Sequence, residues 1–91
     1  MKRVVYSREA ELTVDNYFES YIGSASHNDL TERAYRLSRI RVCLTYIEVF
    51  TDNTFTIDGR NYIAVEDFAK VEYLEYENEI LILNIFFKNK C

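Results

Sequence analysis

The sequence predicts an α+β domain in which a single, mostly antiparallel sheet packs against a hairpin of two helices. Three observations predict this class. Apolar residues recur at helical spacing over residues 10–47, strand patterns fill residues 55–87, and a short apolar strand precedes both. We expect the order strand, helix, helix and then three strands or four, with the hairpin on one face of a three- to five-stranded sheet. The 91 residues form one domain, 1–91, because they suffice for one small core.

The first strand is predicted over residues 3–6, and Ser7 is placed to cap the helix that follows. Residues 10–22 carry apolar side chains at i, i+4, i+7, i+8, i+11 and i+12, which is the spacing of one helical face. We expect Gly23 to end this helix and the polar stretch GSASHN, residues 23–28, to form a short turn.

A second helix is predicted to begin with Ser26 or Asn28 as its cap and to run to about Phe50. Its apolar face extends from residue 30 to residue 47. Two long helices joined by a short turn must lie antiparallel, so we expect a helical hairpin.

Strand chemistry follows the second helix. Asp58-Gly59 favours a tight two-residue hairpin, although the pair also fits an ordinary turn that leads into one strand over residues 62–66. Glu77-Asn78 predicts the turn of a closing hairpin between a strand from residue 71 and a last strand over residues 80–87. The last strand is apolar on both sides, so we expect helices to cover one face and something else the other. The first strand should pair beside these last strands.

Composition excludes several classes. The net charge of −4 counts against a general nucleic-acid binder. No apolar run approaches the roughly 18 residues of a membrane span, and the N-terminus does not resemble a signal peptide, so we expect a cytoplasmic protein with no membrane association. Cys43 and Cys91 do not form a disulfide framework. The scattered cysteines and His27 give no metal-site pattern, and we expect no cofactor.

Two isolated side chains are candidate catalytic groups. His27 could act as a general base, but it lies in the polar turn without arranged partners, which favours a solvent-exposed turn residue. Cys43 could act as a nucleophile, but its place in the middle of a helix favours a small packing residue.

The second helix carries a stripe of basic residues formed by Arg33, Arg36 and Arg39, with Arg41 apart from it. Such a stripe can bind phosphate or an acidic partner segment. The alternative is a solvated helix face that pairs in part with acids of the first helix. Those acids are Glu9, Glu11, Asp15 and Glu19.

Eight tyrosines and six phenylalanines are many for a chain of this length. Tyrosine combines apolar area with a polar tip and is therefore favoured at interfaces. Five of the tyrosines cannot all lie in so small a core, so an exposed aromatic sheet face is a natural docking surface, with half-buried core tyrosines as the alternative. These five are Tyr35, Tyr46, Tyr62, Tyr73 and Tyr76.

Two stretches resemble the RelE/ParE superfamily of toxins from bacterial type II toxin–antitoxin systems. The stretch VVYSREA, residues 4–10, is similar to the family's first strand and the start of its first helix. The closing hairpin VEYLEYENEILILNIFF, residues 71–87, resembles the family's ending, and the order of elements agrees over the whole chain.

The resemblance implies two activities. RelE-like members cleave mRNA in the ribosome with basic side chains on the sheet, whereas ParE-like members inhibit DNA gyrase and lack those residues. Members of both kinds are held inactive by an antitoxin that covers the sheet and helices. An enzyme of the first kind would use Lys88, Lys90 and Arg60 to contact RNA. Glu72 stands where the family usually has arginine, and a phosphodiester transition state needs focused positive charge, so the resemblance favours the ParE-like activity.

We therefore expect a toxin-like component that acts by protein binding rather than as an enzyme. Its expected partner is a cognate antitoxin, and DNA gyrase is the candidate target. The alternatives are a ribosome-dependent mRNA endoribonuclease and a non-toxic structural or interaction domain, and a homodimer is left open. The residues expected to bind partners are Arg33, Arg36, Arg39, Tyr62, Tyr73, Tyr76, Lys88 and Lys90.

Overall fold

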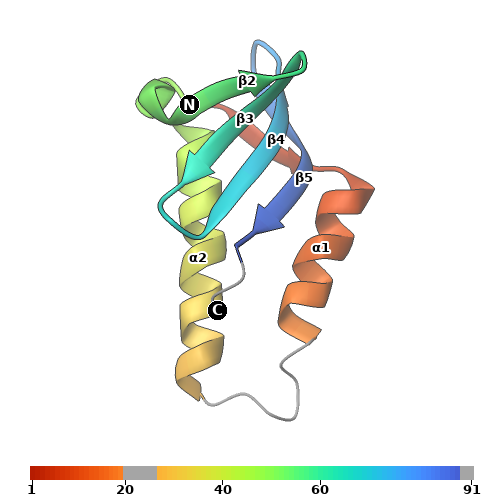
Figure 1. Cartoon of the computed structure of the whole chain (residues 1–91), viewed down its shortest axis with the longest axis vertical. Coiled ribbons are helices and arrows are strands. Elements are labelled where there is room, and N and C mark those ends of the chain that lie inside the picture. Colours follow the sequence, from red (N-terminus) through yellow and green to blue (C-terminus); the bar gives the residue numbers. More distant parts are fainter. Residues whose placement is uncertain (20–26, 89–91) are drawn as a thin grey trace.

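A computed structural model describes residues 1–19 and 27–88, except the side chains of residues 27–29. The described part contains two long helices and five strands, in the predicted order (Figure 1). The elements are β1 (Arg3–Tyr6), α1 (Arg8–Glu19), α2 (His27–Thr45), a 3₁₀ turn (Thr51–Asn53), β2 (Thr54–Ile57), β3 (Arg60–Val65), β4 (Ala69–Glu75) and β5 (Glu79–Phe87). The α+β class and the single sheet are confirmed.

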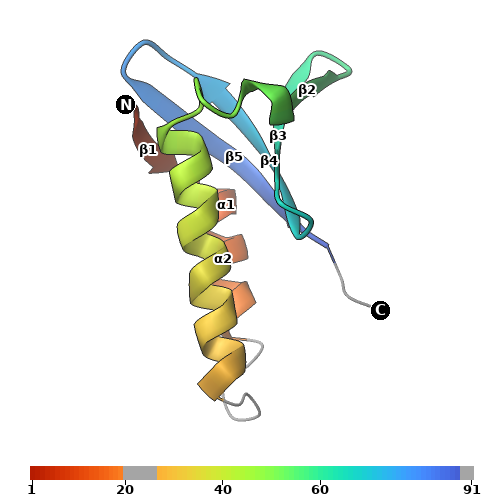
Figure 2. The same cartoon turned by 90° about the vertical axis from the view of Figure 1, so that its left-hand side faces the viewer.

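The strands form one sheet in the order β1-β5-β4-β3-β2. β1 pairs with β5 in parallel and the other pairs are antiparallel, so the prediction that the first strand lies beside the last ones is confirmed. Both helices pack on the same face of the sheet (Figure 2). The other face, called the open face below, is not covered by any element that the structure describes.

Ser7 joins β1 to α1 and fixes both to β5. Its Oγ accepts a hydrogen bond from the Ala10 amide at 3.1 Å, which is the predicted helix cap. The same hydroxyl donates to the Leu83 carbonyl at 2.8 Å, and the Ser7 amide donates to the Ile82 carbonyl at 2.9 Å. One small polar residue thus satisfies the helix start and holds it against the last strand.

The second helix differs from the prediction at both ends. It ends at Thr45 rather than near Phe50, because the chain turns there to bury Ile47 and to pack Phe50 against the core. The Phe50 amide donates to the Ile47 carbonyl at 3.0 Å, which is the spacing of a tight turn and not of an α-helix. His27, expected in the preceding turn, is the first residue of α2. The predicted helix end at Gly23 and the cap at Ser26 lie outside the described residues.

Asp58-Gly59 forms the tight hairpin between β2 and β3, which resolves the alternatives left by the sequence. Ile57 pairs directly with Arg60, so the turn has two residues. Asp58 and Gly59 have positive φ angles of 52° and 78°, as the favoured two-residue hairpin turns require. The predicted closing turn is confirmed between β4 and β5, where the Tyr76 amide donates to the Glu79 carbonyl at 2.8 Å.

A bulge in β5 separates two halves of that strand. Glu72 pairs with Asn84 but its neighbour Tyr73 pairs with Ile82, so Leu83 has no opposite residue. The residues that face the helices are Ile80 and Ile82 before the bulge and Ile85 after it, and all three are buried.

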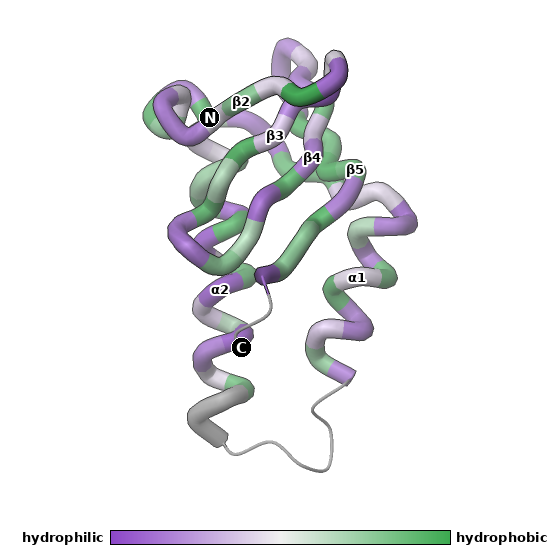
Figure 3. Tube along the Cα trace, viewed as in Figure 1, coloured by the Kyte–Doolittle hydropathy of each residue, from purple (hydrophilic) through white to green (hydrophobic). Residues whose placement is uncertain are grey.

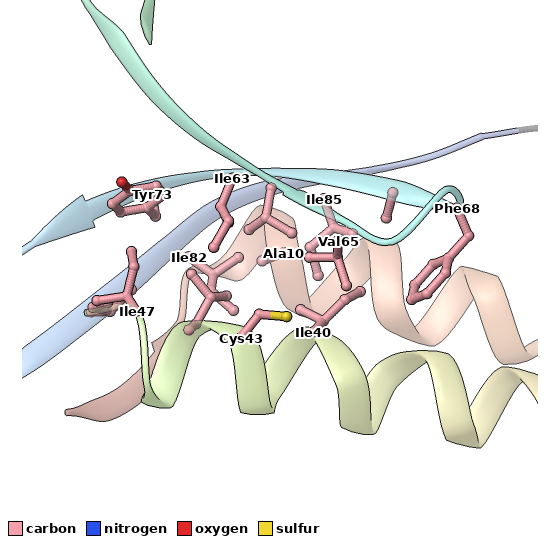
Figure 4. Close-up of a cluster of buried hydrophobic side chains, with 14 residues drawn as sticks. Ala10, Ile40, Cys43, Ile47, Ile63, Val65, Phe68, Tyr73, Ile82 and Ile85 are labelled. Carbon is pink, nitrogen blue, oxygen red and sulfur yellow. The ribbon is translucent and has the colours of Figure 1, made fainter. Parts of the chain in front are cut away.

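The core lies between the sheet and the two helices (Figure 4). Cys43 is buried within it, as expected of a packing residue, and this burial raises the pKa of its thiol. The helices contribute Ala10, Ile40, Cys43 and Leu44, and the turn after α2 contributes Ile47. The sheet contributes Ile63, Val65, Val71, Ile80, Ile82 and Ile85. No described helix is long and apolar enough to cross a membrane.

Candidate functional site

Strand alternation defines which side chains lie on the open face. Ile63, Val71 and Ile85 stand opposite one another and are buried beneath the helices. Successive residues of a strand point to opposite faces, so the residues next to them point away from the helices. The residues on the open face of the three central strands include Tyr62, Ala64, Lys70, Glu72, Asn84 and Phe86.

Large apolar side chains are exposed on this face. Phe55, Ile57, Leu74 and Phe86 have exposed fractions of 36%, 47%, 40% and 43%. Leu74 of β4 stands opposite Leu81 of β5, which in turn stands beside Val5 of β1, so apolar residues extend across these three strands. Figure 3 shows hydrophobic residues interspersed with polar ones along these strands. The second cover expected for the last strand is therefore not supplied by the described residues.

Three aromatic rings and one lysine form a cluster on the open face. The Phe55 and Tyr62 rings stack with centroids 5.4 Å apart, and Phe86 lies 6.5 Å from Tyr62. The Lys70 amino group is 5.2 Å from the centroid of Tyr62 and 5.4 Å from that of Phe86. These neighbours leave only 8% of Tyr62 exposed, although it lies on the face turned away from the two described helices.

Glu72 places a buried carboxylate beside this cluster. Glu72 is 7% exposed, and Asn84 Nδ2 donates a hydrogen bond to Glu72 Oε1 at 3.1 Å. The Arg60 guanidinium lies at the margin of contact, with Nε 4.0 Å from the other carboxylate oxygen. A buried carboxylate needs such partners, because burial without them costs several kcal/mol, on the order of the desolvation penalty of an ion. We call the residues Phe55, Arg60, Tyr62, Lys70, Glu72, Asn84 and Phe86 the open-face cluster.

The structure separates the residues predicted to contact RNA. Arg60 belongs to the open-face cluster, whereas Lys88 follows β5 at the opposite end of the sheet. Asn61, after Arg60, pairs with Tyr73, and Phe87, before Lys88, pairs with Ala69. Tyr73 and Ala69 are four residue steps apart along β4, which corresponds to roughly 13 Å. Lys90 lies outside the described residues.

The predicted partner-binding tyrosines fall in three environments. Tyr62 is in the open-face cluster, and Tyr76 is 53% exposed beside the closing turn. Tyr73 lies instead in the core on the helix-covered face (Figure 4). Burial raises the pKa of its phenol, and the nearby Glu75 carboxylate raises it further.

The arginine stripe is engaged within the fold. Arg33 donates to the Tyr17 carbonyl and stacks on the Tyr17 ring, with its guanidinium carbon 4.0 Å from the centroid. Arg36 contacts the Tyr17 hydroxyl at 3.1 Å and forms an ion pair with Glu32. Arg39 pairs with Glu66 at 2.8 Å. The expected partners on the first helix are not used, since none of the four α1 acids forms an ion pair within the described chain.

Lys70 and Phe86 were not identified as site residues from the sequence, and Glu72 was considered only as evidence against RNA cleavage. The alternation Lys70-Val71-Glu72 could have placed the lysine and the glutamate on one face, opposite the apolar Val71. Phe86 joins them only through the pairing of β4 with β5, which the sequence does not specify.

No known family supplies a further argument. Comparison of the sequence with models of known protein families and with curated proteins gives no match. Across the residues that the structure describes, no group of three His, Cys, Asp or Glu side chains is arranged to hold a metal ion.

Proposed function

We propose that the protein is a cytoplasmic, toxin-like component of a type II toxin–antitoxin system that acts by protein binding through the open face. The exposed apolar residues Phe55, Ile57, Leu74 and Phe86 carry this proposal, because they gather on one uncovered sheet face. Contiguous exposed apolar surface of this kind marks interaction sites. The order of elements that suggested the family is also the order in the structure.

The composition of the open face suits a protein partner. Aromatic rings and arginine are enriched at the centres of protein interfaces, and Tyr62, Phe86 and Arg60 lie together here. A neutralising antitoxin that covered this face would bury the same residues that the toxin needs for its target. Neutralisation would then be direct competition for one surface.

Inducible expression with and without the neighbouring gene tests this proposal. Expression alone is expected to arrest growth, and co-expression of the neighbouring gene to restore it. Leu74→Lys with Phe86→Lys should abolish arrest, since two charges would be buried on binding. Leu12→Lys with Val49→Lys is the matched control, because these residues are 52% and 76% exposed away from the open face. Equal toxicity of both double variants would contradict binding through the open face.

DNA gyrase is the proposed target, and the purified enzyme tests it directly. The protein is expected to inhibit supercoiling of relaxed plasmid, and the Leu74→Lys, Phe86→Lys variant to lose inhibition. If a large molar excess of the folded protein leaves supercoiling unchanged, gyrase is eliminated as the target.

Cleavage of mRNA is a second candidate, favoured by the position of Glu72 between Asn84 and Arg60 with Lys70 nearby. A carboxylate can accept the proton of a ribose 2′-OH, and cations can stabilise the charge that develops on phosphate. Exposed rings such as Phe86 can stack on a base.

Glu72→Gln and Lys70→Met separate the two candidates. If the open-face cluster cleaves RNA, each substitution should abolish mRNA cleavage in a translating extract and also relieve growth arrest. Lys88→Ala is the matched control, because Lys88 is an exposed cation outside the cluster. Growth arrest that persists in both Glu72→Gln and Lys70→Met would exclude cleavage by these residues.

A further inference from the structure

Within the part of the chain that the structure describes, one edge of β1 has no neighbouring strand. The Arg3 amide donates to the Asn78 carbonyl at 3.0 Å and the Ser7 amide to the Ile82 carbonyl at 2.9 Å, so these residues face β5. Backbone groups alternate in direction along a strand, and therefore those of Val4 and Tyr6 face away from β5. The backbone of Lys2 points the same way as that of Val4 and Tyr6, and its amide donates to the Thr45 carbonyl at the end of α2 at 3.0 Å.

Two hollows lie at the two ends of β1. One, of about 470 Å³, is lined at the start of β1 by residues that include Val4, Arg41 and Thr45. The other, of about 350 Å³, is lined at the end of β1 by Tyr6, Glu11, Val14 and Asp15. None of the β1 residues is fully buried, which is consistent with an uncovered edge.

The two hollows carry opposite charge. Lys2, Arg3 and Arg41 line the first hollow. Lys2 pairs with Glu75 and Arg3 with Glu79, whereas Arg41 makes no ion pair with any residue that the structure describes and so supplies the positive charge. Glu11 and Asp15 line the second and likewise form no ion pair within the described chain. Charge along the edge therefore changes from positive to negative in the direction of the strand.

A strand edge with this polarity is complementary to itself. When two copies of β1 run antiparallel about a twofold axis at Val5, the basic start of each lies beside the acidic end of the other. The same register pairs Val4 with Tyr6 of the second copy, which are the residues whose backbone groups face outward. Val5 then meets its own counterpart on the open face, where it adjoins Leu81.

We propose that the protein forms a twofold dimer through antiparallel pairing of β1 with β1 of a second copy. Arg41 of each copy then lies near Glu11 and Asp15 of the other. The two sheets become one continuous sheet of ten strands, twice the five of one chain. This proposal is independent of the toxin proposal, because it concerns a different surface and is tested by mass and not by toxicity.

A charge exchange between two variants is the sharpest test. Arg41→Glu alone and Glu11→Lys with Asp15→Lys alone are each expected to weaken dimerisation at least tenfold, as measured by sedimentation equilibrium. A 1:1 mixture should restore the dimer. In the mixed dimer one half of the interface pairs the exchanged charges, and the other half keeps the original pairing of Arg41 with Glu11 and Asp15. A mixture that remains monomeric while both variants are folded by circular dichroism would overturn the proposal.

Substitutions at the two sheet edges provide the control. Val5→Lys places two lysines at the twofold axis and should give a monomer of 10.9 kDa at concentrations where the unmodified chain has twice that mass. Thr56→Lys on the free edge of β2 should leave the dimer unchanged. A chain that is monomeric at millimolar concentration, or a dimer that persists with Val5→Lys, would also overturn the proposal.

Discussion

The Ser7 hydroxyl is used twice, as acceptor for the Ala10 amide and as donor to the Leu83 carbonyl. This side chain therefore links the end of β1 to both α1 and β5. Because the bonds are partly buried, water replaces them poorly when the hydroxyl is removed. The effect of Ser7 on stability should therefore exceed that of an exposed serine.

Ser7→Ala is expected to lower the free energy of unfolding by about 1–2 kcal/mol, through loss of the cap and of the bond to β5. Urea denaturation followed by circular dichroism measures this change. Ser38→Ala is the control, since its hydroxyl donates to the Tyr35 carbonyl on an exposed helix surface. A loss of similar size in Ser38→Ala would contradict the role assigned to Ser7.

Two phenols, that of the half-buried Tyr6 and that of the buried Tyr73, predict how stability changes at high pH. Burial raises the pKa of Tyr6 and of Tyr73 above the ordinary value of 10.0, although the Arg41 charge partly lowers that of Tyr6. The unfolded chain then loses these protons first, so the contribution of the two phenols to stability is constant well below pH 10 and is lost as the pH rises above it. Urea denaturation at pH 8 and at pH 10.5 should show the fall, and Tyr6→Phe with Tyr73→Phe should reduce it. An equal fall in both proteins would contradict this account.

At the scale of elements, Tyr17 connects the helical hairpin to the sheet. Its ring stacks on Phe87 of β5 with centroids 3.8 Å apart, and the Arg33 guanidinium also lies over it. Arg36 approaches its hydroxyl at 3.1 Å. The prediction that two helices form a hairpin concerned their direction, whereas these contacts show what holds α1 to α2 and β5.

Tyr17→Ala is expected to destabilise the protein by about 2–3 kcal/mol, because a half-buried ring with stacked partners is lost. Thermal unfolding followed by circular dichroism measures this effect. Tyr35→Ala is the matched control on α2, since Tyr35 is 54% exposed, and it should change stability by no more than about 0.5 kcal/mol. Unfolding at the same temperature in both variants would contradict the prediction.

At the scale of the whole molecule, the sheet brings together segments far apart in the sequence. Val5 of β1 stands beside Leu81 of β5, and Lys2 bonds to the end of α2. Val4 and Tyr6 also pack against the core. The first six residues therefore contribute a strand, part of the core and a link to α2.

Deletion of residues 1–6 is expected to abolish cooperative unfolding. The truncated chain should keep part of its helical signal but lose dispersed amide resonances, because β5 would lose its parallel neighbour. Removal of Met1 alone is the control, since that residue is 89% exposed and should leave the spectrum unchanged. A truncated chain with a sharp transition and native dispersion would show that β1 is dispensable.

The sequence was sufficient to predict features set by neighbouring residues, and insufficient to predict those set by how strands align side by side. Helix spacing, the Asp58-Gly59 turn and the Ser7 cap each depend on neighbours within a few residues, and all three are confirmed. The open-face cluster depends on how β3, β4 and β5 align, which no local pattern specifies. The partners of Arg36 and Arg39 likewise depend on tertiary packing, which is why acids of α1 were expected in their place.

The bulge at Leu83 has a consequence for insertions and deletions in this strand. Core positions are even-numbered before it, at Ile80 and Ile82, and odd-numbered after it, at Ile85. A regular strand of the same residues would turn Asn84 inward and Ile85 outward, so core residues and open-face residues would change places. Leu83 absorbs the extra residue, so it is the position where loss of one residue would leave both faces as they are. Gain or loss of a residue elsewhere in β5 would require the bulge to move.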